Sequence, residues 1–312
     1  MPENKCCRDS SLEANEHLYG TVPKVDNWLL LEYSGHWEKD SLEKSSIAVP
    51  VKEEIKKILD SLDNSRLQLI QRENQKGGSI NFYYIKSTEF EPKSYHFQLN
   101  SYEELLELDL ISLIEKGDLN DSETDEKIAL VCTHGAYDSC CGSHGVPVYN
   151  KLSENSGLSV WKTTHVGSHR FSANIVMLPE GVYYGRVSPE NVDEIANTHL
   201  RGEISLDNFR GRCCYQQSAQ VSDYFLRKQL GKEVVLNIYD IEWVFQRDRY
   251  EYTSVEFLVK KMNIVFSVNC LVLNSAVTVK QSCTDSEAVS IPQFYYYSII
   301  PYEPETEEEK GQ

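Results

Sequence analysis

The chain has 312 residues, a mass of 35.8 kDa and a formal net charge of −17, because 48 acidic side chains outnumber 31 basic ones. The length fits about two domains of roughly 150 residues each. The acidic excess argues against nucleic acid as a partner, since phosphate binding needs a basic surface. No apolar run approaches the ~20 residues of a membrane span, and the N-terminus lacks the apolar segment of a secretion signal. We therefore expect a soluble, cytoplasmic protein that does not contact membranes.

An N-terminal α/β domain is predicted over residues 17–116, after a polar start that we expect to be loosely ordered. Its apolar pattern indicates a strand, a helix, three strands and a helix. These elements are expected at residues 28–33, 51–62, 66–71, 79–86, 95–100 and 102–115, with a turn at Gly77-Gly78. Ser101 and Glu104 have the spacing of a capping box at the start of the last helix. Residues 117–127 contain five acids and no apolar period, which predicts a linker.

A second domain, residues 127–212, shows the same order of elements. The strands are expected at 128–132, 160–164, 173–178 and 182–187, and the helices at about 147–155 and from Ser188 to about 199–202. A loop rich in Cys, His and Gly joins the first strand to the first helix, over residues 133–145. A C-terminal region, residues 216–302, is predicted as one helix followed by a β-rich segment. Residues 303–312 are acidic and are expected to be disordered.

The two domains also resemble each other where they close. Residues 95–107 and residues 182–194 both read as a strand, a corner and the start of a helix. We hypothesise that the first domain is a copy of the second that binds no ligand. Failure of the two domains to superpose would contradict this hypothesis.

The chain has nine cysteines, and six of them form adjacent pairs at Cys6-Cys7, Cys140-Cys141 and Cys213-Cys214. An odd number with adjacent pairs is a poor disulfide framework, because neighbouring cysteines seldom reach good bridge geometry. In a reducing compartment such residues are more often metal ligands, redox thiols or buried side chains.

Two cysteines and two histidines stand at the ends of neighbouring predicted strands. Cys132 ends one strand and Cys141 follows in the next loop, while His165 and His169 follow the strand at 160–164. The gap between Cys141 and His165 is too long for the usual zinc-finger spacing of about 12 to 15 residues. Nearby glycines at 135, 142 and 167 would let the backbone approach a bulky group. These residues indicate a metal or iron-sulfur site without choosing between them.

Several of these stretches resemble the sucrase/ferredoxin-like family, over most of residues 17–230. They are Cys132-Thr-His-Gly135, Asp138-Ser-Cys-Cys141, Thr164-His-Val-Gly-Ser-His-Arg-Phe171, Tyr19-Gly-Thr21, Trp28-Leu-Leu-Leu-Glu32 with Gly35-His-Trp37, and Arg210-Gly-Arg212. Separately, residues 184–195 with His199-Leu-Arg-Gly202 are similar to the closing segment of thioredoxin-like 2Fe-2S ferredoxins.

The resemblance implies a mixed α/β (α+β) fold, in which a thioredoxin-like domain holds a 2Fe-2S cluster. Family members with the His-x3-His motif use two cysteines and two histidines, which here correspond to Cys132, Cys141, His165 and His169. Histidine ligands on one iron remove negative charge and raise the reduction potential, as in Rieske centres. Their second ring nitrogen can titrate, so reduction is expected to be coupled to proton uptake.

The other cysteines and histidines have simpler interpretations. Cys140 is an alternative to Cys141 as the ligand, and His134 and His144 are more readily loop or supporting residues than ligands. Arg170 either donates a hydrogen bond near the cluster or pairs with a surface acid. The remaining cysteines are interpreted as ordinary thiols (Cys213, Cys214), a core residue (Cys270) and residues of a mobile tail (Cys6, Cys7).

The leading hypothesis is therefore one-electron transfer between a reductase and an acceptor that the sequence does not identify. The alternatives are a thiol oxidoreductase on a thioredoxin-like fold, which lacks Cys-x-x-Cys, and a structural zinc site in an interaction protein. Sucrose hydrolysis, suggested by the family name, needs two opposed carboxylates in a cleft. No motif in the chain selects such a pair, so we expect an electron carrier rather than a hydrolase.

Overall fold

The computed structural model describes residues 5–73, 78–154, 157–231, 246–249, 252–259 and 262–304. Gly77 of the expected turn and most of the acidic tail, residues 305–312, lie outside this range. In the described part of the chain, no helix is long and apolar enough to span a membrane.

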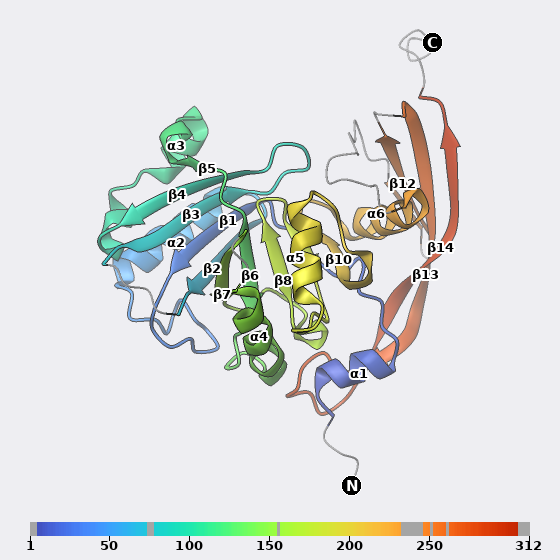
Figure 1. Ribbon diagram of the computed structural model, residues 1–312, viewed down its shortest axis with the longest axis horizontal. Coiled ribbons are helices and arrows are strands. Elements are labelled where there is room, and N and C mark those ends of the chain that lie inside the picture. The colour runs from blue at the N-terminus through green and yellow to red at the C-terminus, as the bar shows by residue number, and fades with distance from the viewer. Residues whose placement is uncertain are drawn as a thin grey trace.

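Ten strands form one continuous sheet in the order β10-β9-β8-β6-β7-β2-β1-β3-β4-β5 (Figure 1). Their bounds are β1 Asn27–Glu32, β2 Ser65–Gln71, β3 Ile80–Lys86, β4 Lys93–Leu99, β5 Glu123–Thr124, β6 Ile128–Cys132, β7 Ser159–Thr163, β8 Ile175–Leu178, β9 Val182–Tyr184 and β10 Phe209–Arg212. The predicted α/β class is confirmed.

The two halves of this sheet have the same topology. Within β2-β1-β3-β4 and within β7-β6-β8-β9, the first pair is parallel and the other two are antiparallel. This is the strand arrangement of a thioredoxin-like unit. The halves join edge to edge, where β2 pairs antiparallel with β7. A shared topology is what the hypothesis of a duplicated unit requires, and common ancestry of the halves stays a prediction.

Alternating side chains give the sheet two buried faces. One face forms a single core that crosses both halves and includes Trp28, Leu130 and Trp161. The other face forms separate cores beneath α2 (Val49–Ser61) in the first half and beneath α4 (Ser139–Leu152) and α5 (Val192–Leu200) in the second. Strands β6 and β8 are apolar along their whole length, and β1 is apolar between its end residues, because both of their faces are covered.

Some predicted boundaries are wrong. The helix expected at about 147–155 begins at Ser139, so half of the expected loop is helical. The helix expected at 102–115 is a 3-10 turn, Tyr102–Leu106, followed by α3, Leu110–Lys116. Ser101 makes no capping bond; instead the Glu104 carboxylate accepts hydrogen bonds from the backbone N–H and side-chain amide of Asn100.

The expected linker and the expected loose N-terminus both contain regular structure. Within residues 117–127, the 3-10 turn Asn120–Ser122 leads into β5, which pairs with β4 at the edge of the sheet. Near the N-terminus, α1 (Cys7–Glu13) packs against the 3-10 turn His169–Phe171 and the strand Ile264–Val279, and it buries Cys7 and Ser11. Residues 117–127 are therefore part of the fold and not a linker. Cys7 is a buried helical residue and does not belong to a mobile tail.

The C-terminal region forms a second, four-stranded sheet beside the first (Figure 1). Its strands are β11 Gln246–Arg249, β12 Tyr252–Val259, β13 Ile264–Val279 and β14 Val289–Tyr302. Helix α6, Gln217–Leu230, contacts β10 of the large sheet and forms a core with β12, β13 and β14 of the small one. The long β13–β14 hairpin turns beside α1, whereas the end of β14 lies at the opposite end of the hairpin (Figure 1).

A glycine lets α4 lie directly on the strand that leads to the candidate site. A Cβ added at Gly145 would stand 2.0 Å from the carbonyl oxygen of Cys132. We predict that Gly145→Ala lowers the free energy of unfolding by about 1–3 kcal/mol, because the helix must move off β6. Urea denaturation measures the change. Gly78→Ala is the matched control, since an added Cβ there meets nothing within 4 Å; equal midpoints for the two variants would contradict the packing argument.

Candidate metal centre

Cys132, Cys141 and His165 meet at the carboxyl edge of β6 and β7. Cys132 is the last residue of β6, where it lies in register with Thr163 of β7, and His165 follows β7 by two residues. Cys141 lies in the first turn of α4. One ligand atom from each of the three residues falls within 4.8 Å of the other two, and Cys141 Sγ is 3.6 Å from His165 Nδ1. The parallel pairing of β6 and β7 brings these residues together.

His169 lies beside this group but not within its 4.8 Å limit. It begins the 3-10 turn His169–Phe171, and its ring centroid is 5.1 Å from that of His165. Both of its ring nitrogens are buried and lack a well-directed hydrogen-bond partner. Buried imidazole nitrogens are usually paired, so this ring fits the role of a fourth ligand to a bound group.

The two thiols are deeply buried and interact through a hydrogen bond. Cys132 is 1% exposed and Cys141 is fully buried. A hydrogen bond from Cys141 lowers the pKa of Cys132 well below its ordinary value, against the opposing cost of burial, and the same bond raises the pKa of Cys141. The site thus favours a thiolate at Cys132. Thiolate and imidazole donors suit iron-sulfur clusters and zinc.

His134 holds the His165 backbone in place. Its Nδ1 accepts a hydrogen bond from the His165 N–H at 3.2 Å, and its Nε2 donates to the Glu38 carbonyl at 2.9 Å. These two roles require a neutral ring with its proton on Nε2, and burial lowers the pKa of His134 accordingly. His134 is therefore a supporting residue, as the sequence suggested.

Tyr137 was not identified from the sequence, although it lies between the two motifs. Its ring stacks on His165 with centroids 4.0 Å apart and lies 5.9 Å from the ring of His169. Tyr137 therefore orients the His165 ring. The only sequence feature that could have indicated this role for Tyr137 is its position as an aromatic residue in a loop rich in Cys and His.

Asp138 was quoted in the family motif but given no role. Its side chain caps α4 by accepting a hydrogen bond from the Cys140 N–H at 2.9 Å. Its other oxygen lies 3.5 Å from His169 Nε2. An Asp before a helical stretch is an ordinary N-cap signal, so this residue could have moved the predicted start of the helix to its observed position.

The two adjacent cysteines face different surroundings. Cys141 lies with Cys132 and His165, whereas Cys140 Sγ lies 3.3 Å from Cys283 Sγ and is not part of that group. The geometry favours Cys141 over Cys140 as the ligand, and ligation itself stays a prediction. Arg170 pairs with Glu16 at 2.8 Å, but this carboxylate is buried and is not the surface acid that was expected.

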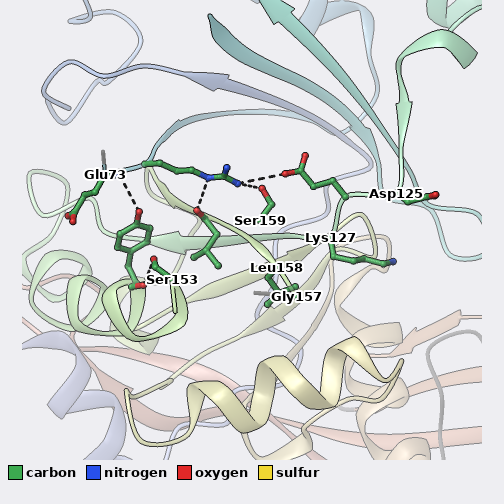
Figure 2. A pocket seen from close by; sticks show the side chains of 11 residues that line it. Glu73, Asp125, Lys127, Ser153, Gly157, Leu158 and Ser159 are labelled. Atoms are coloured by element: carbon green, nitrogen blue, oxygen red, sulfur yellow. Dashed lines mark hydrogen bonds and ion pairs between the residues drawn. The ribbon is translucent and has the colours of Figure 1, made fainter. Parts of the chain in front are cut away.

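A separate cleft of about 670 Å³ lies away from this centre and is lined by several acids (Figure 2). Two of these acids are held by cations: Glu126 pairs with Arg72 at 3.7 Å and Glu73 pairs with Lys162. The Arg72 guanidinium is itself stacked on the Trp161 ring at 3.8 Å. Carboxylates held in ion pairs are poorly suited to act as the acid and base of glycoside hydrolysis, so this cleft gives sucrose hydrolysis no support.

Comparisons with known proteins agree with the resemblance seen in the motifs. Two curated relatives are named "Altered inheritance of mitochondria protein 32". The one from Meyerozyma guilliermondii is 31% identical over 118 residues, covering 34% of this chain and 42% of its own length. The one from Candida glabrata is 28% identical over 96 residues, covering 26% and 31%. A 2Fe-2S ferredoxin from Aquifex aeolicus is 57% identical over 28 residues, covering 9% and 25%.

The chain spans less than half the length of these curated relatives. Among solved structures, the wild-type thioredoxin-like [2Fe-2S] ferredoxin from Aquifex aeolicus is 25% identical, covering 28% of this chain and 97% of the ferredoxin with a TM-score of 0.25. The model of the sucrase/ferredoxin-like family matches residues 18–211, which include both halves of the large sheet and all four predicted ligands. Because this match covers more than half of the sequence, the chain belongs to the sucrase/ferredoxin-like family.

Proposed function

We propose that this protein is a one-electron carrier that holds a 2Fe-2S cluster on Cys132, Cys141, His165 and His169. The observation that carries the proposal is the convergence of two buried thiols and an imidazole within 4.8 Å, beside a second imidazole whose ring centroid lies 5.1 Å from the first. When bound, such a cluster supplies one-electron redox chemistry, and imidazole ligands raise its potential.

The protein surrounds this site unevenly. Both cysteines are buried, whereas His165 and His169 are partly exposed, with 14% of the His169 side chain accessible. The histidine edge is therefore the side nearest to solvent, and we propose that electrons and protons are exchanged there. Tyr137, which stacks on His165, is also partly exposed and extends this edge.

The partners follow from charge and chemistry. The relatives' printed names include a ferredoxin, and a ferredoxin-like carrier needs a reductase and an acceptor that dock transiently. A net charge of −17 favours partners with a basic docking surface, because long-range attraction raises the association rate. Such docking should weaken as ionic strength rises.

Metal analysis of protein purified without oxygen tests this function. We expect two iron and two acid-labile sulfide per chain at the centre, visible absorption, and an EPR signal that appears only after reduction with dithionite. Zinc at this centre in place of iron would instead support a structural site. Protein that stays free of iron through reconstitution would overturn the proposal.

A further inference from the structure

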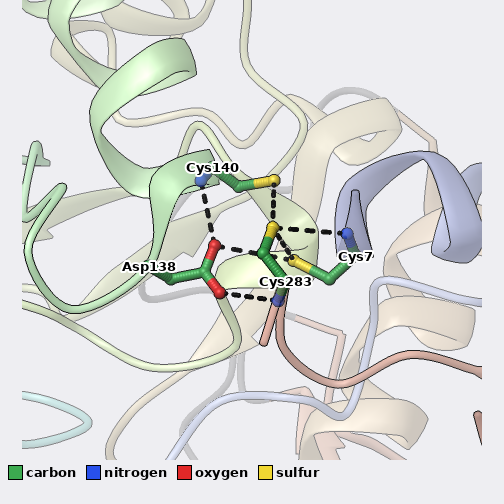
Figure 3. Close-up of side chains that lie close together, drawn as sticks. All are labelled: Cys7, Asp138, Cys140 and Cys283. Carbon is green, nitrogen blue, oxygen red and sulfur yellow. Dashed lines mark hydrogen bonds between the residues drawn. The ribbon is translucent and has the colours of Figure 1, made fainter. Parts of the chain in front are cut away.

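A second group of side chains of the types that bind metal ions gathers around Cys140 (Figure 3). It consists of Cys7, Asp138, Cys140 and Cys283, and one ligand atom from each falls within 4.8 Å of the other three. Cys7 comes from α1, Cys140 from the first turn of α4, and Cys283 from the loop between β13 and β14. Three segments separated by as many as 276 residues thus converge on one point.

The distances between these atoms suit a shared metal ion better than a disulfide. Cys140 Sγ lies 3.3 Å and Cys7 Sγ 3.5 Å from Cys283 Sγ, and Cys7 Sγ lies 3.7 Å from Asp138 Oδ1. A disulfide would require about 2.05 Å. Tetrahedral zinc with Zn–S bonds of about 2.3 Å places its sulfur ligands about 3.8 Å apart, so small movements would complete such a site.

Three of the four members are buried, Cys283 is partly exposed, and the carboxylate is fixed in place. Cys7 is fully buried, and Cys140 and Asp138 are 1% and 3% exposed. One Asp138 oxygen accepts a hydrogen bond from the Cys140 N–H at 2.9 Å, and the other accepts from the Cys283 N–H at 2.8 Å. Asp138 is therefore bonded to the backbone of two of the three cysteines. Ser282 Oγ also donates to Oδ2 at 3.0 Å, so the lone pair that a metal ion would use lies on Oδ1, which faces Cys7 Sγ at 3.7 Å.

Hydrogen bonds between thiols would contribute little to holding three segments together that are distant in the sequence. A thiol is a weak hydrogen-bond donor and acceptor, whereas a structural zinc ion contributes directly to folding because it fixes ligands that are far apart in the unfolded chain. The loop that carries Cys283 is also held to α1 by a hydrogen bond from the Lys280 N–H to Ser10 Oγ at 3.0 Å. The loop and helix are thus positioned to present their cysteines to one ion.

We propose that Cys7, Cys140, Cys283 and Asp138 form a structural zinc site that fastens α1 and the β13–β14 loop to the start of α4. Three thiolates and one carboxylate oxygen are ligands that zinc accepts in a four-coordinate site. A neighbouring group, Cys6, Cys140 and His144, shares Cys140 but offers only two thiols and is more exposed. The proposal does not depend on the cluster at Cys132 and Cys141.

Zinc and iron content of the full chain, measured separately, test the site. Wild-type protein should contain one zinc per chain, and zinc X-ray absorption should show about three sulfur neighbours at ~2.3 Å and one oxygen at ~2.0 Å. Cys283→Ser should lose at least about four-fifths of the zinc and keep its iron, since Cys283 is outside the group of Cys132, Cys141 and His165. Cys214→Ser is the matched control, because Cys214 is also a partly exposed thiol but belongs to neither group, and it should keep both metals.

Three results would overturn the assignment. The first is zinc content unchanged in Cys283→Ser. The second is a two-sulfur environment, which would indicate the neighbouring group with His144. The third is a zinc-free wild type whose peptide mass map shows a disulfide joining Cys283 to Cys140 or Cys7. Cys132→Ser should keep its zinc, which separates failure of this site from failure of the proposed iron-sulfur centre.

Discussion

Cys132→Ser and Cys141→Ser are each expected to retain less than about a tenth of the wild-type iron, whereas Cys140→Ser is expected to retain nearly all of it. A serine hydroxyl is a far poorer ligand for iron than a thiolate, and iron-sulfur clusters depend on thiolate ligation. Iron and sulfide analysis with visible absorption measures the loss. The comparison is sharp because Cys140 and Cys141 are adjacent, buried and in the same turn of α4.

The same variants separate the two metal sites. Cys140 Sγ contacts Cys283 rather than Cys132, so Cys140→Ser should lose zinc while it keeps iron. Cys132→Ser and Cys141→Ser should show the reverse pattern. Loss of iron in Cys140→Ser with retention in Cys141→Ser would contradict the ligand assignment and would make Cys140 the ligand. Far-ultraviolet circular dichroism of each variant controls for loss of the fold.

Much of the large sheet could be predicted because several of its strands are continuous apolar runs bounded by polar residues. The run Trp28-Leu-Leu-Leu is apolar on both faces, and the observed strand, Asn27–Glu32, differs from the expected one by one residue at each end. The strand ending at Cys132 has the same character and the expected bounds. A strand that is buried on both faces is apolar throughout and is bounded by polar residues, so its ends are visible in the sequence.

The start of α4 was missed because its residues have poor helical propensity. Gly142, Gly145 and Pro147 disfavour a helix in isolation, yet all three lie within Ser139–Leu152. Packing overrides propensity here, since only a glycine at position 145 allows the helix to approach the Cys132 carbonyl. Because the turn that carries Cys141 is helical, the two adjacent side chains point in different directions. Cys141 lies beside Cys132 and His165, and Cys140 lies beside Cys283.

The group around Cys283 could not be predicted from the sequence at all. Its members are distributed over three segments, and only the docking of the β13–β14 loop against α1 and α4 brings them together. The spacing of residues along the sequence gives no sign of a contact between segments so far apart. The proximity of Cys132, Cys141 and His165 could be predicted because they lie at or after the ends of neighbouring parallel strands, whose carboxyl ends share one edge of the sheet.

His165→Cys and His169→Cys are expected to keep a cluster and to lower its midpoint potential, by roughly 100 mV or more for each replacement. The direction follows from charge, because a thiolate adds the negative charge that a neutral imidazole lacks, and clusters ligated only by cysteine have potentials several hundred millivolts below Rieske centres. Redox titration followed by EPR measures the shift. His96→Gln is the control, since His96 lies on β4 in the other half of the sheet and its replacement should leave the potential unchanged.

The same titrations, repeated at several pH values, test whether the histidines take up protons. Reduction adds negative charge beside the imidazoles, so a ring nitrogen that is not bound to iron should hold a proton more readily in the reduced protein. Raising the pH removes that proton, and the wild-type potential should fall by up to about 59 mV per pH unit for one proton per electron. Asp138, 3.5 Å from His169 Nε2, is placed to stabilise the protonated ring. A wild-type potential that is flat from about pH 6 to 10 would contradict histidine ligation with proton uptake, and His→Cys variants with the wild-type slope would assign that proton to another group.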